Sequence, residues 1–210
     1  MTADDNSTEE WLRRAALGDR RALDELLAAH RSRLRRIVAV RLDRRLTGRI
    51  DASDVVQDSL LEATQRLPEY LSRQEVPFFV WLRQLAWQRV AQLYRHHVEA
   101  QCRSVEREAA EGVPLSEESA MVLADRLAMS GTSPSGRLRR EELRTQVRSA
   151  LARLAPNDQE VLVLRHLEQL STREISAILQ ISEPAVRHRQ RRALERLTKL
   201  LRSTSEEGSG

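Results

Sequence analysis

The fold of this chain is decided by the stretch STREISAILQISEPAVRHRQRRALERL, which occupies residues 171–197. Its first four residues are a capping-box sequence, which predicts the start of a short helix that ends at Leu179. Residues 180–181 are expected to form a turn, and Ser182 is expected to cap a second, longer helix. A short helix, a tight turn and a longer basic helix are typical of the helix-turn-helix motif.

The second of these helices separates its side chains into an apolar arc and a basic arc. Counted at about 100° per residue, the apolar arc holds Val186, Ala193, Leu197 and Leu200. The opposite arc holds Arg187, His188, Arg191, Arg192 and Glu195. Such a face can enter the major groove of DNA, where arginine can bond guanine bidentately. Three arginines lie nearer the edges and are better placed for DNA phosphates: Arg173, Arg189 and Arg196.

Charge supports a nucleic-acid partner for this end of the chain. Residues 137–203 carry 15 basic and 8 acidic groups, whereas residues 1–100 carry 17 and 15. The alternative is that the basic arc is the solvated face of an ordinary helical bundle. Five arginines and one acid fall within residues 187–196, so DNA binding is the favoured interpretation.

The composition of the 210 residues excludes several classes of protein. A single cysteine allows neither a disulfide framework nor a cysteine-built zinc site. The N-terminus lacks the basic and apolar regions of a signal peptide, and no apolar run approaches the ~18 residues of a membrane span. Aromatic residues make up only 3% of the chain. We therefore expect a soluble, cytoplasmic, all-α protein that needs no metal and no cofactor.

Apolar periodicity predicts two small helical domains joined by a flexible linker. The first domain is expected over residues 8–100. Its helices are predicted at residues 9–29, at residues 31–46, from Asp51 or Ser53 to Leu67, and from Pro77 to His97. Pro68 is expected to end the third of these helices.

The linker is expected over residues 101–136, because glycine and proline are frequent there and the apolar period is weak. Residues 115–129 could form one short helix within it. The second domain, which contains the helix-turn-helix, is expected over residues 137–203. A disordered tail is expected over residues 204–210.

Two surfaces of the first domain carry candidate binding residues. The helix from Asp51 has an acidic stripe flanked by an exposed apolar residue, which suits docking onto a basic protein surface, although a merely solvated face is the simpler alternative. The stripe and its flanks are Asp51, Asp54, Gln57, Asp58, Leu61 and Glu62.

The helix after Pro77 presents aromatic, cationic and amide side chains together, as surfaces that stack single-stranded bases do. These side chains are Arg83, Gln84, Trp87 and Gln88. Trp87 could equally pack against a neighbouring helix, and Arg89 falls on the predicted buried arc, where it would need an acid from another helix.

In combination these segments resemble the sigma factors of bacterial RNA polymerase, sigma-70 family, of the two-domain extracytoplasmic-function group. Residues 51–58 resemble the segment that docks on the β′ clamp of core polymerase, and residues 78–86 resemble the promoter-melting helix. Residues 150–179 resemble the C-terminal domain of the group. The chain departs from the family at Gln180, where glycine is usual, and at His188, where a small hydroxyl residue is usual.

The resemblance implies a factor that directs promoter recognition, promoter melting and transcription initiation, and not an enzyme. It assigns polymerase docking to Asp54, Gln57 and Asp58. It assigns the −35 element to Arg187, His188, Arg191 and Arg192, and the −10 element to Arg83, Gln84, Trp87 and Gln88. Residues 70–75 fall where the family captures a flipped base, and the linker falls where it threads toward the polymerase active site. Implied partners are core polymerase, promoter DNA in the nucleoid and, as a candidate, an anti-sigma factor.

Two other classes of function stay open at this level. A stand-alone helix-turn-helix regulator would bind duplex DNA without polymerase and would not need the face around Gln57 and Asp58. A helical adaptor that binds only proteins would leave the arginine arc unexplained. Catalysis by Asp54 and Asp58, or a metal held by residues 96–97 and Cys102, is disfavoured, because the carboxylates are expected on a convex exposed helix.

Overall fold

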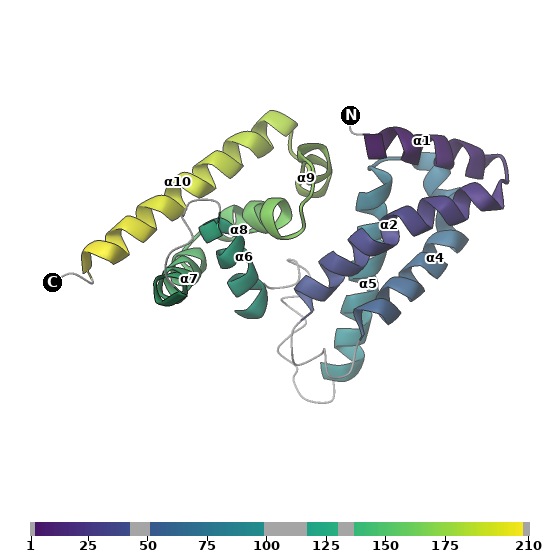
Figure 1. Ribbon diagram of the computed structural model, residues 1–210. Coiled ribbons are helices and arrows are strands. Elements are labelled where there is room, and N and C mark those ends of the chain that lie inside the picture. The colour runs from purple at the N-terminus through teal and green to yellow at the C-terminus, as the bar shows by residue number, and fades with distance from the viewer. Residues whose placement is uncertain (1–2, 43–50, 99–116, 130–136, 208–210) are drawn as a thin grey trace. The chain divides into compact units, whose positions relative to one another are not determined.

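The structure, a computed structural model, describes residues 3–42, 51–98, 117–129 and 137–207 (Figure 1). All regular structure in these residues is helical, as the sequence predicts. Contacts divide the chain into two compact units, Met1–Pro114 and Leu115–Gly210. Cys102, which the sequence raised as a metal ligand, lies outside the described residues.

The first unit is a four-helix arrangement in which α2 contacts each of the other helices. Its helices are α1 (Ala3–Ala16), α2 (Arg20–Arg41), α4 (Ala52–Arg73) and α5 (Phe78–Val98). The core is built from side chains that all four contribute, because each helix buries one apolar stripe. Its buried members are Leu12, Leu26, Ala63, Leu67, Tyr70, Phe78, Leu82 and Leu85. Trp81, which is partly buried, packs against this cluster.

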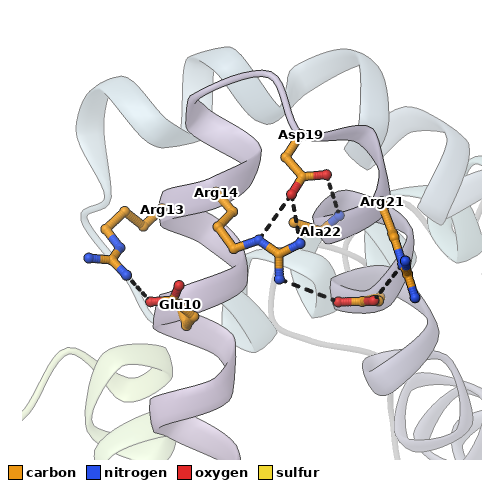
Figure 2. Close-up of polar contacts among 7 residues, drawn as sticks. Glu10, Arg13, Arg14, Asp19, Arg21 and Ala22 are labelled. Carbon is orange, nitrogen blue, oxygen red and sulfur yellow. Dashed lines mark hydrogen bonds and ion pairs between the residues drawn. The ribbon is translucent and has the colours of Figure 1, made fainter.

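The single helix predicted over residues 9–29 is wrong, because the chain turns between α1 and α2. Gly18 has a φ of +88°, a conformation that side chains with a Cβ rarely adopt. Asp19 then caps α2, accepting a hydrogen bond from the backbone N–H of Ala22 at 3.2 Å. Figure 2 shows Arg14 reaching back to the same carboxylate, with Nη2 2.7 Å from Oδ2. Hydrogen bonding to Arg14 lowers the pKa of Asp19, so this turn is held by a charged pair.

The predicted end of the third helix at Pro68 is also wrong, because α4 continues to Arg73 with Pro68 inside it. Proline removes one helical hydrogen bond, so the extra turn needs support from elsewhere. Tyr70 supplies that support. Its ring stacks on Trp81 with centroids 4.7 Å apart, and its hydroxyl donates to the carbonyl oxygen of Val76 at 3.0 Å. Tertiary packing has therefore extended the helix past a residue that would otherwise end it.

All regular structure in the described residues of the second unit is helical. Its elements are α6 (Glu117–Met129), α7 (Arg137–Ala152), α8 (Pro156–Leu162), the π-helical turn η2 (Val163–Leu167), α9 (Thr172–Leu179) and α10 (Glu183–Glu207). The shortest segments, α8 and η2, contact each other and the longer helices around them. In Figure 1, α10 is the long helix that ends at the C-terminus. It packs on α7, α8 and α9. Helix α10 also runs through residues 204–207, which the sequence assigned to a disordered tail.

Helix α6 belongs to the second unit, so the linker predicted over residues 101–136 is corrected in its middle part. The helix packs on α7 and η2, and Leu123 and Ala124 are completely buried there. Arg126 donates hydrogen bonds to the carbonyl oxygens of His166 at 2.7 Å and Leu167 at 3.1 Å. The sequence did not predict these contacts, because they involve only two completely buried side chains and one arginine and therefore leave a weak apolar period.

The helix-turn-helix forms as predicted. Ser171 Oγ accepts from the backbone N–H of Glu174, and the Glu174 carboxylate accepts from the backbone N–H of Ser171 at 2.7 Å, which completes the capping box. Ser182 Oγ accepts from the backbone N–H of Ala185 at 3.3 Å and begins α10. Between the helices, Gln180 adopts the left-handed conformation with φ +52° and ψ +41°. The geometry explains why glycine suits this position, since a Cβ is disfavoured there.

We expect Gln180→Gly to stabilise the second unit by about 1 kcal/mol, because glycine adopts the left-handed conformation without the steric penalty of a Cβ. Gln180→Ala is the matched control, since it removes the same side chain and keeps the Cβ. Chemical denaturation of both variants measures the difference. Equal stability of the glycine and alanine variants would contradict a backbone origin.

Candidate nucleic-acid and protein-binding surfaces

The basic face of α10 lies as the helical wheel predicts. Val186, Ala193 and Leu197 are buried against the rest of the unit. The four residues assigned to base contacts, Arg187, His188, Arg191 and Arg192, are all exposed. Arg187 and Arg191 pair with acids of their own helix at 3.4 and 3.7 Å. Exposed ion pairs of this kind contribute little to the stability of the fold. Both guanidinium groups can therefore leave these acids and bind a ligand with little loss of stability.

Of the three arginines expected at DNA phosphates, Arg196 has a partner within the protein. Its guanidinium pairs with the carboxylate of Asp158, whose side chain is only 7% exposed. Removal of one partner from such a pair leaves a buried charge uncompensated. Arg196 therefore joins α10 to α8, although its own side chain is 48% exposed. Arg173 is exposed on α9 and Arg189 is half-buried on α10. Both therefore remain candidates for contacts with DNA phosphates at the edges of the basic face.

Two acids of the α4 stripe have partners on or next to their own helix, and the residues assigned to docking are exposed. Asp51 caps the helix, and the hydrogen bond from the backbone N–H of Ser53 lowers the pKa of Asp51. Glu62 pairs with Arg66 at 3.1 Å. Asp54, Gln57 and Asp58 are exposed. Leu61 beside them is 60% exposed, one of few large apolar side chains this open among the described residues.

Asp58 is also the acid that Arg89 of α5 was predicted to need. Its Oδ2 lies 2.9 Å from Nε and 2.7 Å from Nη2 of Arg89. The bidentate pair joins the acidic face of α4 to α5. The sequence indicated that such a partner was required, and the tertiary structure identifies which carboxylate it is.

The α5 face is less exposed than predicted. Arg83 is 7% exposed, not open to solvent as expected, and its guanidinium lies 5.1 Å from the ring of Trp87. Trp87 itself is half-buried, while Gln84 and Gln88 are exposed. Two residues outside the predicted set form a cation–π contact next to this face, and one of them, Phe79, is only 3% exposed. The guanidinium of Arg33, from α2, lies 3.8 Å over the ring of Phe79. The four-residue spacing of Phe79, Arg83 and Trp87 was the available signal.

The loop expected to capture a flipped base is mostly helical. Tyr70 is buried at 8% exposure, and α4 continues to Arg73. Only Gln74 to Pro77 lie between α4 and α5, and Gln74 ends α4 with a φ of +44°. Tyr70 therefore supports the fold. Gln74 and Glu75 are the residues of this segment that follow α4, and both are exposed.

One half-buried histidine lies next to α6. His166 in η2 has a buried Nε2 without a hydrogen-bond partner among the described residues. Burial lowers the pKa of His166, and the charges of Arg165 and Arg126 lower it further. A protonated imidazole would therefore be disfavoured at this position.

We expect the second unit to lose stability as the pH falls below about 6.5, the ordinary pKa of histidine. The folded form holds His166 neutral while the unfolded chain takes up a proton, so acid favours unfolding until the lowered pKa of the folded state is passed. Thermal melts between pH 7.5 and 5.5 measure the slope. His166→Leu should reduce that slope, while the control His188→Gln on the exposed face of α10 should keep it. An unchanged slope in the His166 variant would show that another group governs the effect.

The comparisons with known proteins agree with this geometry. Residues 144–197, from α7 into α10, match the family model described as Sigma-70, region 4. The chain is 29% identical over 194 residues to RNA polymerase sigma factor CnrH of Cupriavidus metallidurans, which covers 91% of this chain and 93% of that protein. It is 24% identical over 193 residues to the RNA polymerase sigma-H factor of Pseudomonas aeruginosa, at 92% and 93% coverage.

These findings show the role of an RNA polymerase sigma factor, with a region 4 domain of the sigma-70 type at residues 144–197. The resemblance to the extracytoplasmic-function group is thereby confirmed. The solved structure of CnrH in complex with the cytosolic domain of CnrY is similar to the sigma factor described here. The match has a TM-score of 0.51 at 25% identity, and it covers 94% of this chain and 98% of the other.

The likeness reaches across nearly the full length of these relatives, so both helical units of the sigma factor have counterparts in them. The matched region 4 segment contains the whole of α8, η2 and α9. No helix in the described part of the sigma factor combines the length and apolar character needed to cross a bilayer.

Proposed function

We propose that this sigma factor binds core RNA polymerase through α4 and directs promoter recognition and opening through α10 and α5. The single observation that supports this most is the outward arginine face of α10 within the region 4 match. Arg187, His188, Arg191 and Arg192 would read base edges of the −35 element in the major groove. Arg173 and Arg189 would contact the flanking phosphates.

The docking surface in this proposal is the outward part of the α4 stripe. Asp54 and Asp58 would face a basic surface of the polymerase β′ clamp, and the amide of Gln57 would fix the register. Leu61 gives this surface an exposed apolar contact. Carboxylates beside an exposed leucine suit a protein partner better than DNA, whose phosphates they repel.

Promoter melting would use α5. Gln84, Gln88 and Trp87 would contact the −10 element once it is single-stranded. Arg83 is packed over Trp87, so its role in this proposal is to hold the indole ring.

Proteins of this kind regulate transcription and are not themselves enzymes, and we propose no catalytic activity for this chain. Because the protein acts on nucleoid DNA in this proposal, we propose that it is located in the cytoplasm.

CnrH is solved in complex with the cytosolic domain of CnrY, which supports a proposal that this chain too binds a partner protein, and we propose an anti-sigma factor. Such an anti-sigma factor would cover surfaces that polymerase or DNA otherwise contact. Core polymerase should compete with it for binding.

Transcription from a cognate promoter with purified core polymerase, with and without this protein, tests the function. We expect promoter-specific transcripts only when both are present. Specific binding of promoter duplex by the protein alone, with no effect on polymerase, would instead support a stand-alone regulator.

A further inference from the structure

The contact between α8 and α10 contains a buried acid that the proposed function does not use. Asp158, in the first turn of α8, has a side chain that is only 7% exposed, and its Oδ2 accepts a hydrogen bond from Nη1 of Arg196. The two helices also pack on each other and bury apolar residues, Val161 of α8 and Leu197 of α10 among them. Removal of a carboxylate from water offsets much of its attraction to an arginine. Stability alone therefore does not account for the pair.

The pair is asymmetric, and this asymmetry leaves Arg196 open to a second anion. The side chain of Arg196 is 48% exposed, although its partner is buried. Within the described part of the chain, Asp158 is the one acid that pairs with Arg196, and the contact is made through Nη1. A guanidinium carries five N–H donors in a fixed plane, so those on Nε and Nη2 are left for a ligand. Asp158 thus holds one end of a half-exposed cation.

Arg196 continues a row of arginines along one edge of α10. Arg189, Arg192 and Arg196 are spaced three and four residues apart, so they follow one another on successive turns of the helix. Arg196 lies about 6 Å beyond Arg192 along the helix axis. Neither Arg189 nor Arg192 makes an ion pair with another described residue. Like charges at this spacing repel one another, so the row favours an anion beside it.

We propose that Asp158 is a positioning residue for DNA binding, which orients Arg196 so that Nε and Nη2 donate to a phosphate of the −35 duplex. The inference rests on the proposed function, which places Arg189 and Arg192 of the same row against that duplex. A phosphate suits the open side of Arg196, because a guanidinium can donate two parallel hydrogen bonds to it. An arginine that is already held in place loses less side-chain freedom when it binds.

The proposal predicts an effect opposite in sign to that of charge alone. Loss of a carboxylate close to DNA should tighten binding, because a repulsion of the phosphates is removed. Loss of a positioning carboxylate should weaken binding, because the DNA must then order the Arg196 side chain itself. Ordering one long side chain at an interface corresponds to roughly two- to tenfold in affinity. We therefore expect Asp158→Ala to weaken the binding of duplex DNA by roughly two- to tenfold.

The test measures binding of the full-length protein to a fluorescent duplex of random sequence as a function of salt, because phosphate contacts do not depend on sequence. Arg196→Gln keeps an amide donor for Asp158 and should reduce the slope of log K against log salt by about 0.9, as one lost phosphate contact does. In that background Asp158→Ala should cause no further loss. Asp158→Asn keeps an acceptor oxygen for Arg196 and should retain more affinity than Asp158→Ala.

Glu195→Ala is the matched control for charge. It removes a carboxylate from the neighbouring position of α10, where the side chain is 66% exposed and pairs with Arg191. Because Glu195 has no buried contact to Arg196, its loss should tighten DNA binding or leave it unchanged. The melting temperature of every variant is measured alongside its affinity.

The outcomes separate this inference from the function beneath it. A wild-type protein that does not bind duplex DNA at any salt concentration would refute the DNA-binding part of the proposed function. If wild type binds, equal or tighter binding by Asp158→Ala would overturn the inference, since the acid then only offsets the charge of Arg196. An equal loss with and without Arg196 would also overturn it, by showing that Asp158 acts through folding. A loss that requires Arg196, is smaller in Asp158→Asn and does not follow the melting temperature supports it.

Discussion

Promoter opening is expected to be lost when Gln57→Ala and Asp58→Arg are combined in the full-length sigma factor and assayed with core polymerase. The new arginine would face a basic surface of the clamp, and like charges placed together in an interface cost roughly 3 kcal/mol. That corresponds to a reduction in docking of about a hundredfold or more. Permanganate footprinting of unpaired thymines measures opening directly. Binding of duplex DNA by α10 should be unchanged, because Arg191 and its neighbours belong to the other unit.

The structure supplies the control that this experiment needs. Asp58→Arg also breaks the pair with Arg89, in which the two side chains are 47% and 37% exposed. An exposed pair contributes at most about 1 kcal/mol. Arg89→Gln breaks the same pair and leaves the docking carboxylate in place, so it should retain most of the opening activity. Normal opening by the double variant would show that α4 is not the docking helix.

Substitution of Arg191 or Arg192 by alanine is expected to weaken use of a cognate promoter and to relax its sequence preference. Each bidentate arginine–guanine pair is worth about 1–3 kcal/mol, which is roughly 5- to 150-fold in affinity. Both side chains are exposed, so folding should be unaffected. Competition between promoters that differ in single −35 base pairs measures the preference.

Arg173→Ala is the matched control for this experiment, because Arg173 is exposed on α9 and is proposed to contact phosphates. It should weaken binding equally across sequences and reduce the salt slope by about 0.9. Arg196 cannot serve as this control, since its loss would leave Asp158 buried without its partner. Wild-type promoter preference in the Arg191 and Arg192 variants would remove α10 from its proposed role as the reading helix.

The sequence by itself determined the features that depend on local spacing. The capping box at Ser171 and Glu174 forms because both partners lie within one turn of the same helix. The buried and exposed arcs of α10 follow from helical geometry alone, since an angle about the helix axis needs no knowledge of the neighbours. The requirement of Arg89 for an acid was visible for the same reason.

Only the tertiary structure decided which distant groups meet. Asp58 is the partner of Arg89, and Asp158 is the partner of Arg196. Tyr70 carries α4 past Pro68 by stacking on Trp81, and Arg126 fixes α6 to η2 through two backbone carbonyls. In each case the outcome depends on a contact between residues far apart in the sequence, which local spacing does not specify. Helical periodicity specifies the direction in which a side chain points, and the packing of the helices specifies what it meets there.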